Sequence, residues 1–304
     1  PKEAVPIANR LIEKDGVKVA VSGSYSGSTR AAAGIFQAAG IPYISAYAIH
    51  PDITRSGNYV FRTSFMGEVQ GRAGALLIGQ TMQRKRVVVI TLKNDFGKSL
   101  ATGFKAEAAN FGIEIINEYE YSIRDRQFGP IVAKVRADKP DAIYASGYFF
   151  TAGPLVNQLR SGGVTVPVIG QEGYDGQHFI KIGGTAAEGV TITTSLDRDS
   201  NKPETLSFIA EYEKFTGNKV DMVSASTHTA IKVVVDAMRK AGTDNPDSIR
   251  QAISQTQLTA ATGQISFNRI GEVRKNVQVQ IVRKGEWHYH SEIRDQNLLA
   301  PPES

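Results

Sequence analysis

The sequence predicts an α/β protein built from two lobes. Apolar, β-branched runs typical of buried strands recur about every 25 residues, with segments of helical periodicity between them. That distance matches a βαβ unit, so we expect parallel sheets covered by helices on both faces. The rhythm breaks at residues 57–74 and 239–248, and a chain of 304 residues suits two domains better than one.

Strands and helices are expected to alternate along most of the chain. The expected strands are 18–21, 42–45, 86–91, 112–116, 141–145, 166–170 and 189–193. An amphipathic first segment at 1–16 is followed by expected helices at 28–39, 97–111, 128–137 and 151–161. From residue 261 the pattern changes to strands joined by turns at Gly271 and Gly285, which predicts an antiparallel tail. The chain would thus leave the first lobe, build the second and return.

Composition excludes several classes of function. The chain has no cysteine, so thiol nucleophiles, disulfides and cysteine-based zinc sites are excluded. Its apolar runs are shorter than the roughly 18 residues that a membrane span requires. The net charge is +5, but the basic residues are dispersed and do not interleave with aromatic ones. We therefore expect no nucleic-acid partner, because such a footprint is clustered on one face.

The loop SGSYSGST, residues 22–29, joins an expected strand to an expected helix. Free amides at a helix start, together with the hydroxyls, form a natural anion site. The loop lacks the lysine of a nucleotide-binding P-loop and the G-x-G-x-x-G spacing of a dinucleotide fold. Two interpretations stay open from these residues alone: a site for a carboxylate-sized anion, or serines that merely cap the helix.

Aromatic residues gather in the loops that follow the expected strands. Ligands of open α/β sheets bind outside the carboxyl ends of the strands. The loops after Ser45, Thr91, Ala145 and Gly170 lie at such ends. They carry Tyr47, Phe96, Tyr148, Phe149, Phe150 and Tyr174. Aromatic walls with few polar groups indicate a small-molecule pocket.

Signals for catalysis are weak. The segment 24–28 lacks the glycines of a nucleophile elbow, and the five histidines show no metal-ligand spacing. Glu172 and Asp175 lie three apart in a loop, where capping or ligand orientation is the better interpretation than acid–base chemistry. We therefore expect no enzyme, no metal and no cofactor.

An ordered set of segments resembles one family over nearly the whole chain. The segments are residues 1–54, YVFRTSF, VVVITLKNDFG, DAIYASGY, VIGQEGYDG, TAAEGV and the tail TGQISFNRIGEVRKNVQVQIVRKGEW. They resemble periplasmic solute-binding proteins of the branched-chain amino acid type, which deliver ligands to the membrane subunits of ABC importers. The resemblance implies a type 1 periplasmic binding fold: two Rossmann-like lobes joined by three crossovers, with the ligand cleft between them. It also implies a periplasmic location, although the first residues have no features of a signal peptide.

The resemblance implies which residues hold the ligand. Ser26 and the next loop, Tyr47, Ala48 and Ile49, would hold a carboxylate, while Tyr148, Glu172 and Tyr174 would come from the second lobe. Phe96 and Asp175 complete the expected site. We expect residues 1–64 and 246–280 to form the first lobe, and 65–245 and 281–304 the second.

Two departures from the family pattern matter. Tyr47 and Ile49 stand where a small residue and a hydroxyl residue are common, and only Glu172 and Asp175 are candidates for the partner of an α-ammonium group. These features favour an aromatic or otherwise apolar carboxylic acid slightly over an amino acid. About one βαβ unit before residue 1 also has no counterpart, so we expect an incomplete first lobe that exchanges elements with a partner, forms a dimer or binds ligand poorly.

Two other functions remain as alternatives. A ligand-sensing regulatory domain on the same fold would need an attached signalling segment. An α/β hydrolase acting through Ser26 would turn over esters. The solute-binding component of an importer is the preferred prediction.

Overall fold

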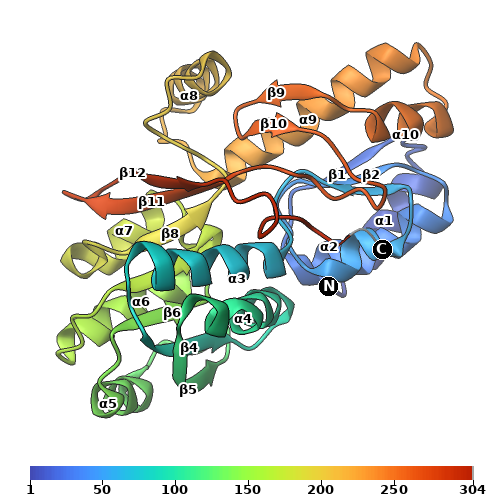
Figure 1. Cartoon of the computed structure of the whole chain (residues 1–304). Helices are drawn as coiled ribbons and strands as arrows, with labels where there is room; N and C mark the ends of the chain where they lie inside the picture. The colour runs from blue at the N-terminus through green and yellow to red at the C-terminus, as the bar shows by residue number, and fades with distance from the viewer. Residues whose placement is uncertain (303–304) are drawn as a thin grey trace.

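The structure is a computed structural model that describes residues 1–302. It contains two main β-sheets, each flanked by helices (Figure 1). The smaller sheet has three parallel strands in the order β1-β2-β3, and the larger has seven in the order β12-β11-β8-β7-β6-β4-β5. Strands β9 (Leu258–Ala260) and β10 (Gly263–Ile265) form a separate antiparallel pair. Within residues 1–302, no helix combines the length and apolarity needed to cross a bilayer.

The first lobe is built on strands β1 (Ala20–Ser22), β2 (Tyr43–Ser45) and β3 (Val60–Arg62). Successive strand residues point to opposite faces. Tyr43 accordingly packs with Phe36 on one face, whereas its neighbour Ile44 packs with Val233 on the other. Helices α1 (Ala4–Glu13) and α2 (Ser26–Ala38) cover the first face, and α9 (Met222–Ala241) and α10 (Pro246–Ser254) cover the second.

Strand β1 forms an open edge of this sheet. Among residues 1–302 it pairs with β2 alone. A groove of about 760 Å³ runs beside it, lined by apolar side chains that include Ile7 and Leu11 of α1. The first lobe therefore has three sheet strands in the described chain, with apolar surface next to the outermost one.

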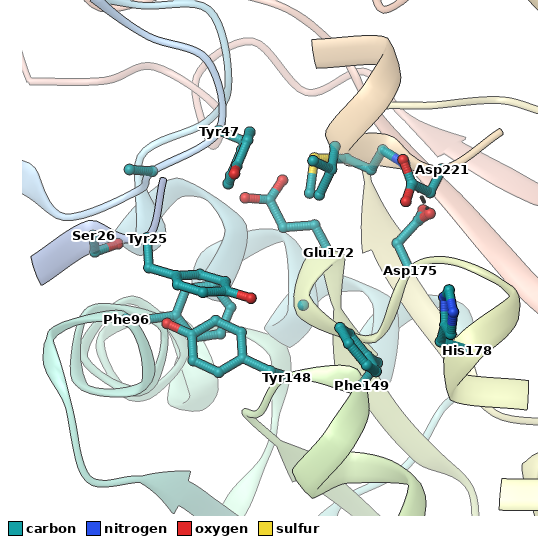
Figure 2. A pocket seen from close by; sticks show the side chains of 14 residues that line it. Tyr25, Ser26, Tyr47, Phe96, Tyr148, Phe149, Glu172, Asp175, His178 and Asp221 are labelled. Carbon is teal, nitrogen blue, oxygen red and sulfur yellow. Dashed lines mark hydrogen bonds between the residues drawn. The ribbon is translucent and has the colours of Figure 1, made fainter. Parts of the chain in front are cut away.

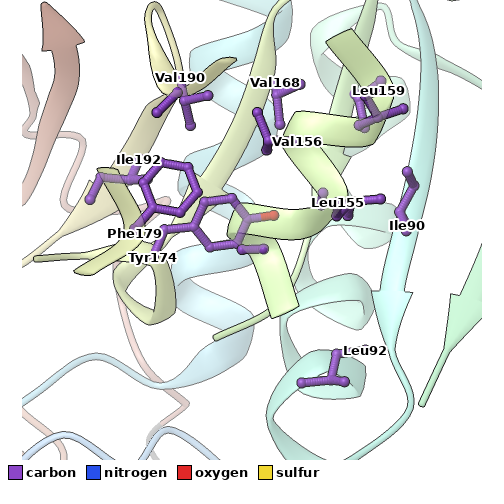
Figure 3. Packing of buried hydrophobic residues seen from close by; sticks show 14 of the residues in the cluster. Ile90, Leu92, Leu155, Val156, Leu159, Val168, Tyr174, Phe179, Val190 and Ile192 are labelled. Atoms are coloured by element: carbon purple, nitrogen blue, oxygen red, sulfur yellow. The ribbon is translucent and has the colours of Figure 1, made fainter. Parts of the chain in front are cut away.

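The second lobe is a larger sheet with a parallel centre. Strands β4 (Arg86–Leu92), β5 (Glu114–Tyr121), β6 (Ala142–Ala145), β7 (Val168–Gln171) and β8 (Thr191–Thr194) are parallel, and β11 (Val277–Arg283) and β12 (Glu286–Ile293) extend it antiparallel. One face packs on α3 (Gly67–Leu76) and most of α4 (Asp95–Ala108), and the other on α5 (Gly129–Asp138), α6 (Phe149–Ser161) and α7 (Gln177–Gly183). Figure 3 shows part of this second core, including Leu155, Val156 and Ile192. Strands β11 and β12 pair antiparallel, which confirms the antiparallel tail predicted from the sequence.

Three chain segments cross between the lobes. Residues 63–66 join β3 to α3, residues 195–221 join β8 to α9 and contain α8 (Pro203–Thr216), and the segment before β11 returns from the first lobe. Helix α8 protrudes in Figure 1 and packs through Phe208 near Ala225 and Ala261. The expected architecture of two lobes with three crossovers is therefore present.

Helix α9 differs from the sequence prediction. The expected range 65–245 assigns it to the second lobe, yet its residues Ala230, Val233, Val234 and Ala237 pack on the three-stranded sheet. Strand β11 also enters the large sheet at Val277, inside the range expected for the first lobe. The reason is physical: an apolar stripe shows that a helix is buried, but not which sheet it meets. The other lobe boundaries stay a prediction.

Candidate functional site

A cavity of about 610 Å³, including its mouth, lies between the two lobes. Tyr25, Ser26, Tyr47 and Ala48 line it from the first lobe. The second lobe contributes Phe96, Tyr148, Phe149, Glu172, Gly173, Asp175 and His178. The start of α9 adds Asp221, Met222 and Val223 (Figure 2). Most predicted site residues therefore meet in one place, because they follow strands whose carboxyl ends face the cleft.

Ser26 is the first residue of α2 and is 2% exposed. Its Oγ accepts a hydrogen bond of 3.2 Å from the backbone N–H of Ile49. Within residues 1–302 this hydroxyl donates no hydrogen bond, so it can donate one to a ligand oxygen. The preceding Tyr25 has extended backbone and gives α2 no side-chain cap, so the helix start faces the cavity with its partial positive charge. Both features suit a carboxylate.

The loop 47–49 contributes less than the sequence predicts. Tyr47 and Ala48 line the cavity, but the side chain of Ile49 lies in the core of the second lobe beside residues such as Leu92 and Phe96. The N–H of Ile49 is already donated to Ser26. Ile49 is thus a packing residue that holds Ser26 in place, and its prediction as a ligand contact is corrected.

An aromatic wall crosses the cleft. Tyr25 of the first lobe lies 4.6 Å from Tyr148 of the second, measured between ring centroids. Phe96 stacks on the same Tyr148 ring at 4.8 Å, and Phe150 lies beyond it at 5.7 Å without lining the cavity. Phe149 faces His178 at 5.5 Å. This wall offers apolar and π surface to a ligand side chain.

Glu172 is a buried carboxyl group that points into the cavity beside Tyr47 and the start of α9 (Figure 2). Its Oε2 accepts a hydrogen bond of 3.2 Å from the Ser64 hydroxyl, whereas Oε1 has no partner among the described residues. Burial raises the pKa of Glu172 to about 8. An unsatisfied buried oxygen of this kind is suited to a hydrogen-bond donor on a ligand.

Asp175 lines the cavity, but its carboxylate is occupied by the protein. It forms an ion pair with Arg198 and accepts hydrogen bonds from the Thr194 hydroxyl and from the Met222 N–H, each at 2.9 Å. The last bond fixes the first turn of α9. Asp175 therefore positions the cavity wall, which agrees with the capping role considered for it from the sequence; its direct contact with a ligand stays a prediction.

Asp221 is a cavity residue that the sequence prediction missed. It caps α9, where its Oδ1 accepts a 2.7 Å hydrogen bond from the Ser224 N–H and the Ser224 hydroxyl accepts from the Asp221 N–H. An Asp three residues before a Ser, ahead of a helical pattern, is a capping signal present in the sequence. That signal locates the helix start, although it does not reveal that the start faces the ligand cavity.

Tyr174 lies behind the cavity. Its ring is fully buried and stacks on Phe179 at 5.0 Å, in the core shown in Figure 3. Gly170 makes room for it, because a Cβ at that glycine would approach the Tyr174 ring to 2.6 Å. Its prediction as a ligand contact is therefore wrong. Close by, the Trp287 indole stacks on Phe179 and donates a 3.1 Å hydrogen bond to the Gly176 carbonyl.

Neither a metal site nor a serine triad emerges around these residues. Within residues 1–302, no group of three His, Asp or Glu side chains could hold a metal ion. The Ser26 hydroxyl is hydrogen-bonded to the backbone amide of Ile49, and among the described residues it has no histidine partner. The cavity combines a helix start, aromatic rings and carboxyl groups, which is an arrangement for binding.

Comparison with known proteins gives a consistent result. Residues 1–285 match the model of a periplasmic binding protein family. A leucine-, isoleucine-, valine-, threonine- and alanine-binding protein of Pseudomonas aeruginosa is 26% identical over 291 residues, covering 95% of this chain and 76% of that protein.

Solved structures share the fold over almost the whole chain. The leucine-binding protein LivK of Thermotoga maritima has a TM-score of 0.91 at 27% identity, covering 97% of this chain and 85% of that one. A solute-binding protein of an ABC transporter from Rhodopseudomonas palustris, solved with benzoate, has a TM-score of 0.89 at 21% identity, with 97% and 84% covered. At that identity the likeness shows the fold alone. This chain belongs to the periplasmic binding protein family of solute-binding proteins.

Proposed function

We propose that the cleft captures a hydrophobic amino acid in its zwitterionic form and presents it to the membrane subunits of an ABC importer in the periplasm. The observation that carries this proposal is Glu172, a buried carboxyl group in the cavity wall whose Oε1 has no hydrogen-bond partner among the described residues. Asp221 adds a second carboxyl group to the wall. The sequence favours an apolar acid because no ammonium partner stands out, and these two groups reverse that preference.

The three parts of such a ligand would meet three different surfaces. The carboxylate suits the start of α2 and the Ser26 hydroxyl. The ammonium suits Glu172, with Asp221 nearby on α9. The apolar side chain suits the rings of Tyr25, Tyr148 and Phe149. The carboxylate and the ammonium group of the ligand would then each face a group of opposite charge or polarity. This is required because burying an unpaired charge away from water is costly.

Binding would be linked to closure of the lobes. Tyr25 and Ser26 come from one lobe and Tyr148 and Glu172 from the other, so a ligand contacts both only when the cleft is shut. The importer would then bind the closed, ligand-loaded form in preference to the open form. A ligand-sensing domain would close in the same way, but it would carry an attached signalling segment, which an importer component lacks. We propose no catalytic role.

An aromatic carboxylic acid is the second candidate, favoured by the aromatic wall. Calorimetric titration separates the two, with L-leucine and L-phenylalanine compared against benzoate. Submillimolar binding of either amino acid with no response to benzoate supports the proposal, and the reverse result overturns it. Mass spectrometry of ligand retained by the purified protein gives an independent identification. An ester-turnover assay tests the hydrolase alternative.

The open edge of β1 supports the expectation of a dimer or of exchanged elements. An edge strand beside an apolar groove readily accepts another strand. Light scattering coupled to size-exclusion chromatography of the 304-residue chain tests this, and a monomer at all concentrations would contradict it.

A further inference from the structure

Arg62 is a fully buried arginine at the end of β3, directly before the first crossover. Its guanidinium forms an ion pair with Glu272, with 2.7 Å between Nη2 and Oε1 and 3.1 Å between Nε and Oε2. Glu272 is also buried and lies on the segment that returns from the first lobe to β11. Nη2 donates a further bond of 3.2 Å to the Thr54 hydroxyl, which in turn donates to Glu272. The pair thus joins the start of one crossover to another.

The backbone brings the two charged residues side by side. Arg62 and Glu272 form an isolated parallel bridge, and the Arg62 N–H donates a 2.9 Å hydrogen bond to the Gly271 carbonyl. Gly271 has a φ of +77°, and a Cβ at this position would collide with the backbone oxygen of Val60. Only glycine lets the returning chain approach β3 this closely. The position of the ion pair is therefore set by the backbone.

The same guanidinium holds the loop that follows β2. Nη1 of Arg62 donates a 3.0 Å hydrogen bond to the backbone carbonyl of Ala48, a residue that lines the ligand cavity. The N–H of the next residue, Ile49, is the group that donates to the Ser26 Oγ at 3.2 Å. That carbonyl and that N–H belong to one peptide unit. Arg62 therefore holds one side of this peptide unit, and the serine at the start of α2 is bonded to the other side.

We propose that Arg62, held by Glu272, is a positioning residue for ligand binding that orients Ser26 through the peptide unit between Ala48 and Ile49; this rests on the proposed contact between Ser26 and a ligand carboxylate. A peptide unit is planar, so its C=O and N–H directions are fixed together. A carbonyl that rotates away from the guanidinium turns the N–H away from Ser26, whose hydroxyl can then adopt other rotamers. Arg62 does not line the cavity and acts through the loop.

A purely structural role is the alternative, because removing one partner of a buried ion pair leaves an uncompensated charge. The two roles can be separated, since both partners neutralise charge but only Arg62 reaches the Ala48 carbonyl. Glu272→Gln keeps the hydrogen bond to the loop and leaves the Arg62 charge unpaired. The double variant Arg62→Met, Glu272→Met removes both charges and also removes the hydrogen bond to the loop.

The experiment compares these two variants by urea unfolding and by calorimetric titration of the whole protein with L-leucine. We expect the double variant to unfold at a higher urea concentration than Glu272→Gln, yet to bind L-leucine about tenfold more weakly than the unmodified protein. Glu272→Gln should be less stable and keep nearly the same Kd. Arg160→Met is the matched control, because Arg160 donates to the Val164 and Val166 carbonyls away from the cavity, and its Kd should be unchanged.

Hydrogen exchange provides a second measurement that needs no ligand and no variant. In the unmodified protein without ligand, the Ile49 amide should be protected from exchange, because Arg62 holds its peptide unit before any ligand arrives. In the double variant the same amide should exchange faster. An Ile49 amide that exchanges freely in the ligand-free protein overturns the proposal.

The outcomes separate this proposal from the proposed function. A double variant that binds as tightly as the unmodified protein, or Kd values that simply follow stability across the variants, overturns the role of Arg62 and leaves the proposed function standing. If benzoate binds and L-leucine does not, the proposed amino acid ligand fails. Benzoate then serves as the probe, and its affinity should fall about tenfold in the double variant because the effect is exerted on the carboxylate.

Discussion

Tyr25 and Tyr148 face each other across the cleft with their ring centroids 4.6 Å apart, one from each lobe. Tyr25 is 49% exposed, and this contact packs its ring against the second lobe. Arg30 and Asp95 form a second bridge between helices α2 and α4, with 3.0 Å between Nη2 and Oδ2. These two contacts join the first lobe to the second.

Replacing Tyr25 by alanine should weaken ligand binding by about 2- to 12-fold, the equivalent of a lost aromatic pair. The loss should appear mainly as faster dissociation, because the closed form is less stable. Stopped-flow kinetics measures the rate, and small-angle scattering measures the spread of the lobes. Tyr289→Ala, a 40% exposed tyrosine on β12, is the control. Equal dissociation rates in both variants would mean that the ring contact does not stabilise closure.

Ser26→Ala should lower both affinity and stability. Loss of the hydroxyl donor should raise the Kd about tenfold, and the orphaned Ile49 N–H should cost about 1–3 kcal/mol of unfolding free energy. Calorimetric titration and urea unfolding measure the two effects. Ser28→Ala, on the same helix but outside the cavity, should change the affinity little. An unchanged Kd in Ser26→Ala would assign the serine to structure alone.

Asp175→Asn should destabilise the fold by about 3–5 kcal/mol, because Arg198 is left without its partner in a largely buried position. The double variant Asp175→Asn, Arg198→Met should recover part of this loss. Urea unfolding of both variants provides the measurement, with the exposed Asp199→Asn as control. If Asp175→Asn keeps its stability and loses ligand selectivity, Asp175 is a ligand-binding residue after all.

Glu172→Gln should stabilise the protein at alkaline pH. In the folded chain Glu172 keeps its proton up to about pH 8, whereas in the unfolded chain it loses it near 4.5, so ionisation favours unfolding increasingly as the pH rises between these values. Glutamine has no such penalty. The difference in unfolding free energy between variant and unmodified protein should grow from pH 5 to 8 and then level.

The stability of Lys275→Met should depend on pH in the opposite direction. The pKa of Lys275 is lowered from 10.5 to about 7, so the unfolded chain binds more protons than the folded chain between these values and the unmodified protein loses stability as the pH falls from about 10.5 to 7. We expect the variant to gain stability relative to the unmodified protein over that range and the difference to level off below pH 7, as measured by urea unfolding from about pH 6 to 10.5. A constant difference across the whole range would show that Lys275 does not titrate there.

Strand-end loops were the most informative part of the sequence. Ser26, Tyr47 and Tyr148 each follow a strand of a parallel sheet, and the carboxyl ends of parallel strands direct such loops to one edge. This argument does not apply to Asp221, because Asp221 follows the long second crossover and not a strand. Its position in the cavity depends on how α9 packs on the first sheet, and the local sequence does not determine that packing.

Tyr174 and Ile49 show why neighbours in a loop have different roles. Both belong to loops that reach the cavity, yet both side chains turn into the core of the second lobe. For Tyr174 the sequence contained an indication of burial, because Gly170 has no side chain and leaves space for the Tyr174 ring. For Ile49 the sequence held no signal, because the direction of a loop residue depends on backbone angles that composition does not determine.

Trp287 makes the binding event observable without any label. It is the one tryptophan in the sequence, and its indole is bonded to Gly176, the residue after Asp175 in the cavity wall. All indole emission therefore comes from a single buried chromophore next to the segment that holds the start of α9. A shift in that loop on ligand uptake would alter the emission, so the native fluorescence of the protein can report occupancy of the cleft in real time.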